Sequence, residues 1–295
     1  MDALLPDELL HEILSYNVKV LRSDFLELDR DRHRWVVGPS RNSDLLLVSK
    51  RWLRIGTPLL YECLQLTKPE HTSSVATLFR AQPNVGLAVR CLRLQGGLGR
   101  DLVHVAKYTP KLQHLLLDPQ IKSADSIAGL KKAFPLFRAS DLYLESDLAY
   151  WRHNKKVIAA WQLLYAYMRE GTFLRTLVLA DHFRAMNNEF VDALAASSIE
   201  EISCDTHRAE EYITSGHMRR IIGSPRLQRV VCRGALAPER THDLLRTNGF
   251  SAADVLKFSI VEGPRDAHWR RIFRAMDEAE AHSSSDSDSD SDEDA

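Results

Sequence analysis

The stretch PKLQHLLL at residues 110–117 carries the pattern on which the prediction of the fold rests. Its leucines follow the pattern x-L-x-x-L-x-L, which is typical of a β-strand that buries one face. The stretch PRLQRVV at residues 225–231 repeats the arrangement. Similar short runs recur along the chain, at residues 62–66, 89–94, 112–117, 141–144, 174–179, 199–202, 227–231 and 255–260. The sequence therefore predicts a series of short strands, most of them with one apolar face.

The spacing of these runs is close to regular. Their apolar markers are Leu64, Leu92, Leu115, Leu142, Leu177, Ile202, Val230 and Phe258, separated by 28, 23, 27, 35, 25, 28 and 28 residues. Helical stretches lie between the markers, at residues 73–81, 155–169, 188–196, 209–222 and 238–247. A strand plus a helix about every 20–29 residues is the signature of a leucine-rich-repeat solenoid.

The repeats are irregular, and the asparagine ladder of a regular repeat is missing. We therefore expect a leucine-rich-repeat-like α/β arc with parallel strands and outer helices, and an open α/β sheet with crossover helices is the alternative. The longest step contains residues 150–170, which predicts a longer helix or an insertion there.

Two apolar segments precede the repeats. The first, LPDELLHEILSY at residues 5–16, reads as a helix, because Pro6 suits a first helical position and the acidic Asp7 and Glu8 favour the positive end of the helix dipole. The second is DLLLVSKRWL at residues 44–53, and TPLLYE at 57–62 predicts a third short helix that begins at Thr57-Pro58. Three short helices cannot bury all this leucine among themselves, so the surplus apolar surface requires a partner.

These two segments resemble an F-box, and in particular the F-boxes of large families in mushroom-forming fungi. The resemblance covers residues 4 to about 66, and P-x-L-Q-x-L units such as the one at 110–115 resemble the degenerate repeats that often follow an F-box. The sequence departs from the family at residues 17–43, where a polar insert of mixed charge separates the two blocks. We expect this insert to form a surface loop that tolerates shortening.

The resemblance implies a non-catalytic substrate-recognition subunit of an SCF-type cullin–RING ubiquitin ligase. The F-box would bind a Skp-family adaptor, which joins it to a cullin scaffold, and the repeat arc would hold an unknown protein substrate. Matched position by position, the residues at or just behind the adaptor interface are Leu5, Pro6, Leu9, Leu10, Ile13, Leu14, Leu46, Val48 and Trp52. Each of them could instead belong to the core, and for Trp52 the two interpretations are nearly balanced.

The predicted organisation is an F-box-like domain at residues 1–61, a leucine-rich-repeat-like domain at 62–282 and a disordered acidic tail at 283–295. Five serines of the tail have an acid three residues on and resemble sites for acidophilic casein-kinase-type enzymes: Ser283, Ser285, Ser287, Ser289 and Ser291. A merely solubilising tail is the alternative. Two other functions remain open, namely a non-ligase binding scaffold and a chaperone for basic proteins that works through the tail.

Composition excludes several other classes. The net charge is −1, and the tail carries six acids and no base, so the body is only about five charges positive, which is too little to indicate nucleic-acid binding. No stretch approaches a membrane span, and acids near the N-terminus argue against a secretory signal. The spacing of Cys63, Cys91, Cys204 and Cys232 indicates neither a zinc site nor a disulfide framework. We expect no cofactor, no metal and no catalytic residue, and a cytoplasmic or nuclear protein.

Overall fold

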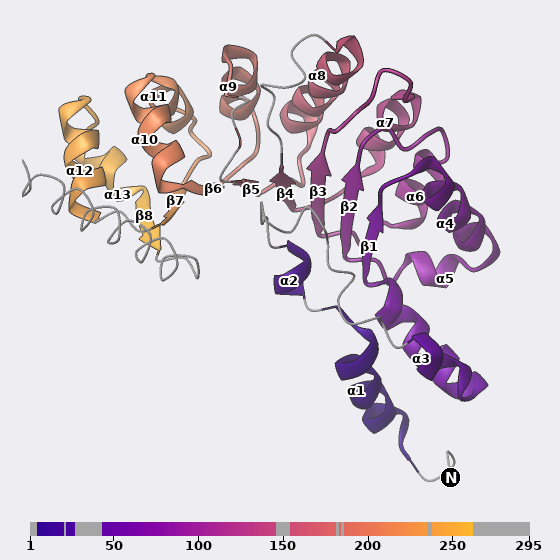
Figure 1. The fold of residues 1–295 in the computed structure, drawn as a ribbon. Coiled ribbons are helices and arrows are strands. Elements are labelled where there is room, and N and C mark those ends of the chain that lie inside the picture. Colours follow the sequence, from indigo (N-terminus) through magenta and orange to yellow (C-terminus); the bar gives the residue numbers. More distant parts are fainter. Residues whose placement is uncertain are drawn as a thin grey trace, which may run out of the picture.

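A computed structural model describes residues 5–20, 22–26, 43–145, 154–180, 183, 186–234 and 238–261 of the chain. Within them, eight strands form one all-parallel sheet whose spatial order is the order of the sequence (Figure 1). The strands are β1 (Cys63–Leu66), β2 (Cys91–Gln95), β3 (His114–Asp118), β4 (Asp141–Leu144), β5 (Thr176–Leu179), β6 (Glu201–Asp205), β7 (Arg229–Arg233) and β8 (Phe258–Val261). The predicted α/β class with parallel strands is confirmed.

The register of the sheet follows the sequence markers. Leu92 pairs with Leu64 on one side and with Leu115 on the other, and the same one-to-one pairing continues through every step to Val230 and Phe258. Because side chains alternate between the two faces of a strand, all the markers point to one face. They are buried there in the main core of the molecule. The other face of the sheet carries the strand residues that precede and follow each marker, and we call it the open face.

Helices connect consecutive strands and lie on one side of the curved sheet (Figure 1). They are α4 (Pro69–Ala81), α5 (Pro83–Gly86), α6 (Leu102–Tyr108), α7 (Ala128–Ala133) with the 3₁₀ turn η3 (Phe134–Leu136), α8 (Lys155–Glu170), α9 (Asn188–Ala195), α10 (Thr206–Thr214), α11 (His217–Ile222), α12 (Pro238–Thr247) and α13 (Ala252–Leu256). The longer helix expected in the longest step is α8, whose Trp161 packs edge-on against Phe183 and Phe190. All three aromatic side chains are buried in the main core.

One predicted helix is divided. Residues 209–222 were expected to form a single helix, but α10 ends at Thr214 and α11 begins at His217. Gly216 between them has a φ of 78°, a left-handed conformation that favours glycine and ends a helix. The break lets both short helices turn an apolar side toward the sheet.

The N-terminal helices form a small core of their own. They are α1 (Asp7–Val18), the 3₁₀ helix η2 (Ser43–Leu47) and α3 (Lys50–Tyr61). The buried side chains between them are Leu10, Leu14, Val18, Leu46 and Leu59. A Cβ added to Gly56 of α3 would lie 2.1 Å from Leu46 Cδ2, so only glycine allows η2 to approach this closely. We call α1, η2 and α3 the N-terminal module.

The predicted third helix of this module does not exist as a separate element. Thr57 and Pro58 lie inside α3, which continues without interruption to Tyr61. A proline in a helix leaves one backbone carbonyl without its N–H donor. Pro58 lies on the exposed side of α3, where water can satisfy that carbonyl, and the Thr57 hydroxyl donates to the Leu53 carbonyl at 2.6 Å.

Candidate protein-binding surfaces

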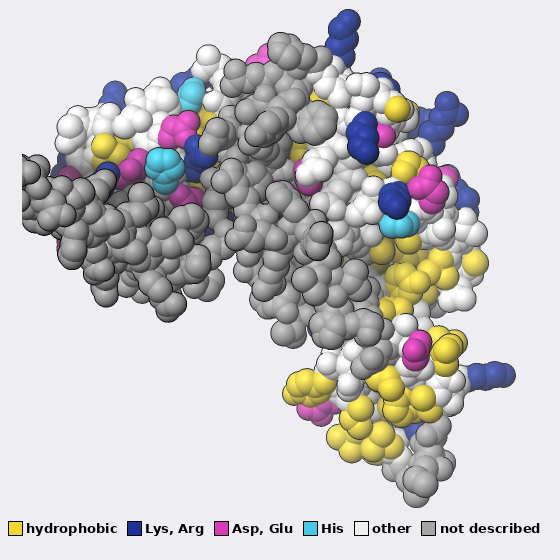
Figure 2. All heavy atoms as spheres, viewed as in Figure 1, with side chains coloured by type: hydrophobic (Ala, Val, Ile, Leu, Met, Phe, Trp, Pro, Cys, Tyr) yellow, Lys and Arg dark blue, Asp and Glu magenta, His cyan; other side chains and the backbone are white. Residues whose placement is uncertain are grey.

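Exposed apolar side chains gather on the N-terminal module. Of the twelve large apolar side chains that are exposed in the described part of the chain, six belong to this region: Leu9, Ile13, Tyr16, Leu47, Val48 and Leu53. Leu9, Ile13 and Tyr16 follow one another at i, i+4 and i+7 along one face of α1, and Tyr16 is 82% exposed. Figure 2 shows apolar side chains over this end of the molecule. We call these six residues the N-terminal apolar surface.

The structure divides the residues that the sequence placed at the adaptor interface. Pro6, Leu9, Ile13 and Val48 are exposed, and Leu5 and Trp52 are half-buried. The remaining three are buried in the small core of the module, behind its exposed surface: Leu10, Leu14 and Leu46. Sequence reasoning missed Tyr16, Leu47 and Leu53, although the i+7 spacing of Tyr16 from Leu9 could have identified the first of these.

Asp7 joins the two long helices of the module. Its carboxylate accepts hydrogen bonds from Arg54 Nη2 and Arg51 Nε, each at 2.7 Å. The hydrogen bond from Arg54, followed by that from Arg51, holds the pKa of Asp7 below its usual range. This contact fixes the first turn of α1 against α3 and thereby sets the shape of the N-terminal apolar surface.

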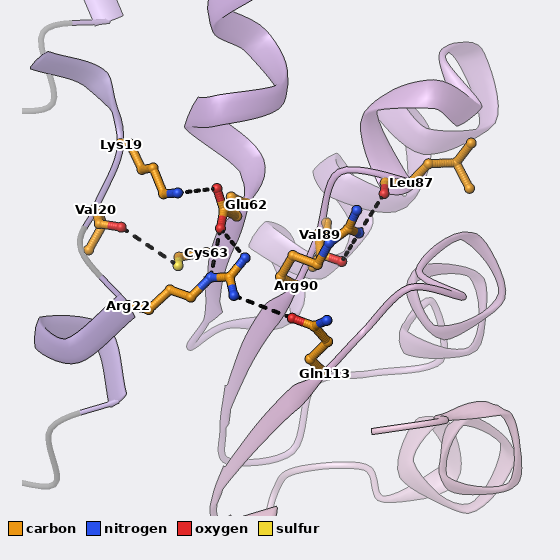
Figure 3. A network of polar contacts seen from close by, with 9 residues as sticks. All are labelled: Lys19, Val20, Arg22, Glu62, Cys63, Leu87, Val89, Arg90 and Gln113. Carbon is orange, nitrogen blue, oxygen red and sulfur yellow. Dashed lines mark hydrogen bonds and ion pairs between the residues drawn. The ribbon is translucent and has the colours of Figure 1, made fainter. Parts of the chain in front are cut away.

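A short segment after α1 attaches the module to the sheet. It comprises Lys19, Val20 and α2 (Arg22–Leu26), and we call it the strap. Lys19 Nζ and Arg22 Nη2 lie 2.9 and 2.6 Å from the carboxylate of Glu62, the residue between α3 and β1 (Figure 3). Burial alone would raise the pKa of Glu62, but the hydrogen bonds from Lys19 and Arg22 outweigh it and hold the pKa below its usual range. The strap and the end of α3 therefore meet at one carboxylate.

The strap also lies on the open face of the sheet. Phe25 is only 2% exposed and belongs to a cluster with Cys63 of β1, Cys91 of β2 and Leu116 of β3. Arg22 Nη1 donates to Gln113 Oε1, just before β3, at 3.4 Å. The expectation that residues 17–43 form a surface loop is therefore wrong where they are described: 17–18 complete α1, 19–20 and 22–26 form the strap, and Ser43 begins η2. Leu21 lies outside the described residues. Residues 27–42 lie outside the described part of the chain.

We expect Phe25→Ala to lower the free energy of unfolding by about 3–5 kcal/mol, because it removes a large buried side chain and leaves a cavity over β1–β3. Phe173→Ala is the matched control, since Phe173 is 51% exposed and its loss should change stability by less than about 1 kcal/mol. Urea unfolding measured by tryptophan fluorescence compares the two variants. Equal stabilities would show that the strap does not pack on the open face in solution.

Further polar side chains are buried on the open face. Arg93 of β2 forms a buried ion pair with Glu145, just after β4. A row of hydrogen bonds runs from Gln65 Nε2 to Gln95 Oε1 at 2.9 Å and from Gln95 Nε2 to Asp118 Oδ2 at 3.4 Å. Burial, together with repulsion from Glu145, raises the pKa of Asp118 to about 7.

The raised pKa of Asp118 gives the fold a dependence on pH. The folded chain binds the proton of the Asp118 carboxyl more tightly than the unfolded chain does. Protonation of Asp118 therefore stabilises the fold fully at low pH, and this stabilisation is lost as pH rises toward 7. We therefore compare the free energy of unfolding of Asp118→Asn with that of the wild type. The difference should favour the variant more at pH 8 than at pH 5, by up to about 3 kcal/mol. Urea unfolding at both pH values measures this difference. The same difference at both pH values would contradict the raised pKa.

The four cysteines lie in two pairs across neighbouring strands. Cys63 is the register partner of Cys91, and Cys204 is the partner of Cys232; all four thiols are buried and none of them forms a disulfide. A hydrogen bond with Cys63 and burial raise the pKa of Cys91, and Cys232 and burial raise the pKa of Cys204 in the same way. The equal offsets of each pair from the strand markers could have identified these neighbours. Raised pKa values disfavour the reactive thiolate at neutral pH.

Some of the predicted features cannot be located. The five tail serines, Ser283 to Ser291, lie outside the described residues. Within residues 5–261, apart from the gaps given above, no helix is long and apolar enough to span a membrane.

No protein-family model matches the chain, and no curated protein matches its sequence.

Proposed function

We propose that this chain is a substrate-recognition subunit of an SCF-type cullin–RING ubiquitin ligase. The N-terminal module would be an F-box that binds a Skp-family adaptor, and the parallel sheet with its helices would be a leucine-rich-repeat-like arc. The observation that carries the proposal is the N-terminal apolar surface. The N-terminal module buries Leu10 and Leu14 but still exposes Leu9, Ile13 and Tyr16, which is apolar area that a partner protein would cover.

The attachment of the module to the sheet supports the same function. Two cations of the strap, Lys19 and Arg22, pair with Glu62 at the end of α3, while Phe25 of the strap packs on the sheet. A module held in this way would present any protein bound to the sheet at a fixed orientation to the adaptor. The ligase would then raise the effective concentration of substrate lysines near a ubiquitin-charged conjugating enzyme. In this scheme the chain itself would perform no bond chemistry.

Co-expression with a Skp-family adaptor, followed by capture of a cullin, tests this function. We expect a stable complex of chain and adaptor that retains the cullin during gel filtration. A chain that binds the adaptor without retaining a cullin would instead be a non-ligase scaffold. A soluble monomer that ignores the adaptor would remove the F-box interpretation altogether.

A further inference from the structure

The edge of the sheet at which the strands begin carries a row of side chains from successive repeats. Backbone hydrogen bonds keep the entering loops in register, from Asp141 N to the Gln113 carbonyl at 2.9 Å and from Arg175 N to the Ser140 carbonyl at 2.7 Å. Lys111, Arg138 and Phe173 each lie four residues before a strand marker. They therefore occupy equivalent positions in neighbouring loops before β3, β4 and β5.

This row is basic and partly apolar. Lys107, Lys111 and Arg138 are exposed, and among the described residues none of them has a carboxylate within 4.0 Å. The Arg138 guanidinium lies over the Phe173 ring, 5.3 Å from its centroid. Phe173 is 51% exposed, and Leu136, the last residue of η3 and two positions before Arg138, is 41% exposed. We call Lys107, Lys111, Leu136, Arg138 and Phe173 the basic rim.

Acidic residues lie near the basic rim, but none of those described pairs with its cations. Asp141 Oδ2 lies 3.1 Å from His114 Nδ1, and in the next loop Glu200 forms an ion pair with Arg175. Glu170, at the end of α8, is the exposed acid of this stretch. Lys107 is in the last turn of α6, where a cation also stabilises the helix dipole, but Lys111 and Arg138 lie in loops and have no such role.

Two further observations favour the rim as a binding surface. The strap occupies the open face over β1–β3, which a ligand of a curved sheet would otherwise use. The rim also lies on the same edge of the sheet as the end of α3, which leads directly into β1 (Figure 1). A segment bound along the rim would thus lie on the side of the arc from which the N-terminal module projects.

From this geometry we infer that the basic rim binds an acidic peptide segment that carries a large apolar side chain. The cations would pair with its carboxylates, and Phe173 and Leu136 would pack against its apolar residue. Given the proposed ligase function, this names the substrate class as proteins with an acidic, aromatic-containing exposed segment. Binding along a row of separate loops suits an extended peptide, because each loop contacts a different residue of it.

A fluorescence anisotropy titration of the full chain tests this inference. The probe is a short fluorescein-labelled peptide of alternating Asp and Glu with a central Phe. Binding should weaken strongly between about 50 mM and about 500 mM salt, since exposed charges are screened. Lys111→Glu with Arg138→Glu should lower the affinity at least about tenfold, and Phe173→Ser should lower it severalfold. Circular dichroism confirms that these surface variants are folded.

The matched control is Lys68→Glu with Arg100→Glu, which makes the same change of charge at exposed positions that follow β1 and β2, at the opposite edge of the sheet from the rim. It should bind the peptide as the wild type does. Equal loss in the control would overturn the inference, as would equal binding of a single-stranded oligonucleotide of the same charge. Binding that requires removal of Ser283–Ala295 would assign the rim to the chain's own tail and also overturn it.

The same variants separate this inference from the ligase proposal. The rim variant should still co-purify with a Skp-family adaptor, because its substitutions lie outside the N-terminal apolar surface. Adaptor binding without peptide binding contradicts the substrate class alone. Peptide binding without adaptor binding contradicts the ligase function alone.

Discussion

Replacing Leu9 and Ile13 by aspartate is expected to abolish co-purification with a Skp-family adaptor while leaving the chain folded. The two side chains are 49% and 43% exposed in the free chain, so a carboxylate there stays hydrated until a partner covers it. Forcing each carboxylate into an apolar interface costs about 2–5 kcal/mol. Together the two substitutions should weaken a submicromolar complex beyond detection in gel filtration.

The choice of positions matters because α1 is apolar on more than one side. Leu10→Asp with Leu14→Asp would also prevent binding, but it would do so by disrupting the core of the N-terminal module. Ile158→Asp with Leu256→Asp is the matched control, since both residues are exposed apolar side chains far from the module in sequence. The control should bind the adaptor normally. An adaptor complex that survives Leu9→Asp with Ile13→Asp would place the interface elsewhere.

A chain that ends before Leu227 is expected to aggregate rather than melt cooperatively. This cut removes β7, β8, α12 and α13, and it uncovers one edge of β6 and the apolar residues that pack against the missing repeats. The lost buried side chains include Leu227, Val230 and Phe258, and each contributes about 1.5–3 kcal/mol through burial. An unpaired parallel edge strand is also a template for association with other chains.

Two shorter truncations serve as controls for this prediction. Removal of Ser283–Ala295 should leave the melting temperature unchanged, because this acidic segment has no apolar side chains to pack apart from the terminal Ala295. A cut after Arg274 should leave a folded protein. Circular dichroism melts compare all three chains. A cooperative melt of the chain that ends before Leu227, at the temperature of the full chain, would show that β7 and β8 are not part of one continuous sheet.

The sequence predicted the sheet well because the sheet is built from local, repeating information. Leu92 and Leu115 were placed in equivalent positions by spacing alone, and the structure pairs them in register. The longest step, before Leu177, contains the longest helix of the described part of the chain. Each repeat buries its marker against its neighbours, so a period in the sequence translates directly into a neighbour in space.

The strap could not be predicted in the same way. Phe25 is a single aromatic residue in a polar stretch, and its burial depends on Cys63, Cys91 and Leu116, which lie 38 to 91 positions further along the chain. No periodic pattern encodes such a contact.

The exposed surface of α1 was only partly predicted for a related reason. Helical periodicity identifies apolar faces, but a helix with apolar residues on two sides does not reveal which side meets its own chain.

Hydroxyl-radical footprinting of the full chain, with and without a Skp-family adaptor, shows whether the N-terminal apolar surface binds the adaptor. Tyr16 and Phe173 are both exposed aromatic side chains, but only Tyr16 belongs to that surface. We expect the adaptor to protect Tyr16, Leu9 and Ile13 from oxidation severalfold while Phe173 reacts at its original rate. Unchanged oxidation of Tyr16 in a mixture that contains saturating adaptor would contradict the claim that the N-terminal apolar surface binds it.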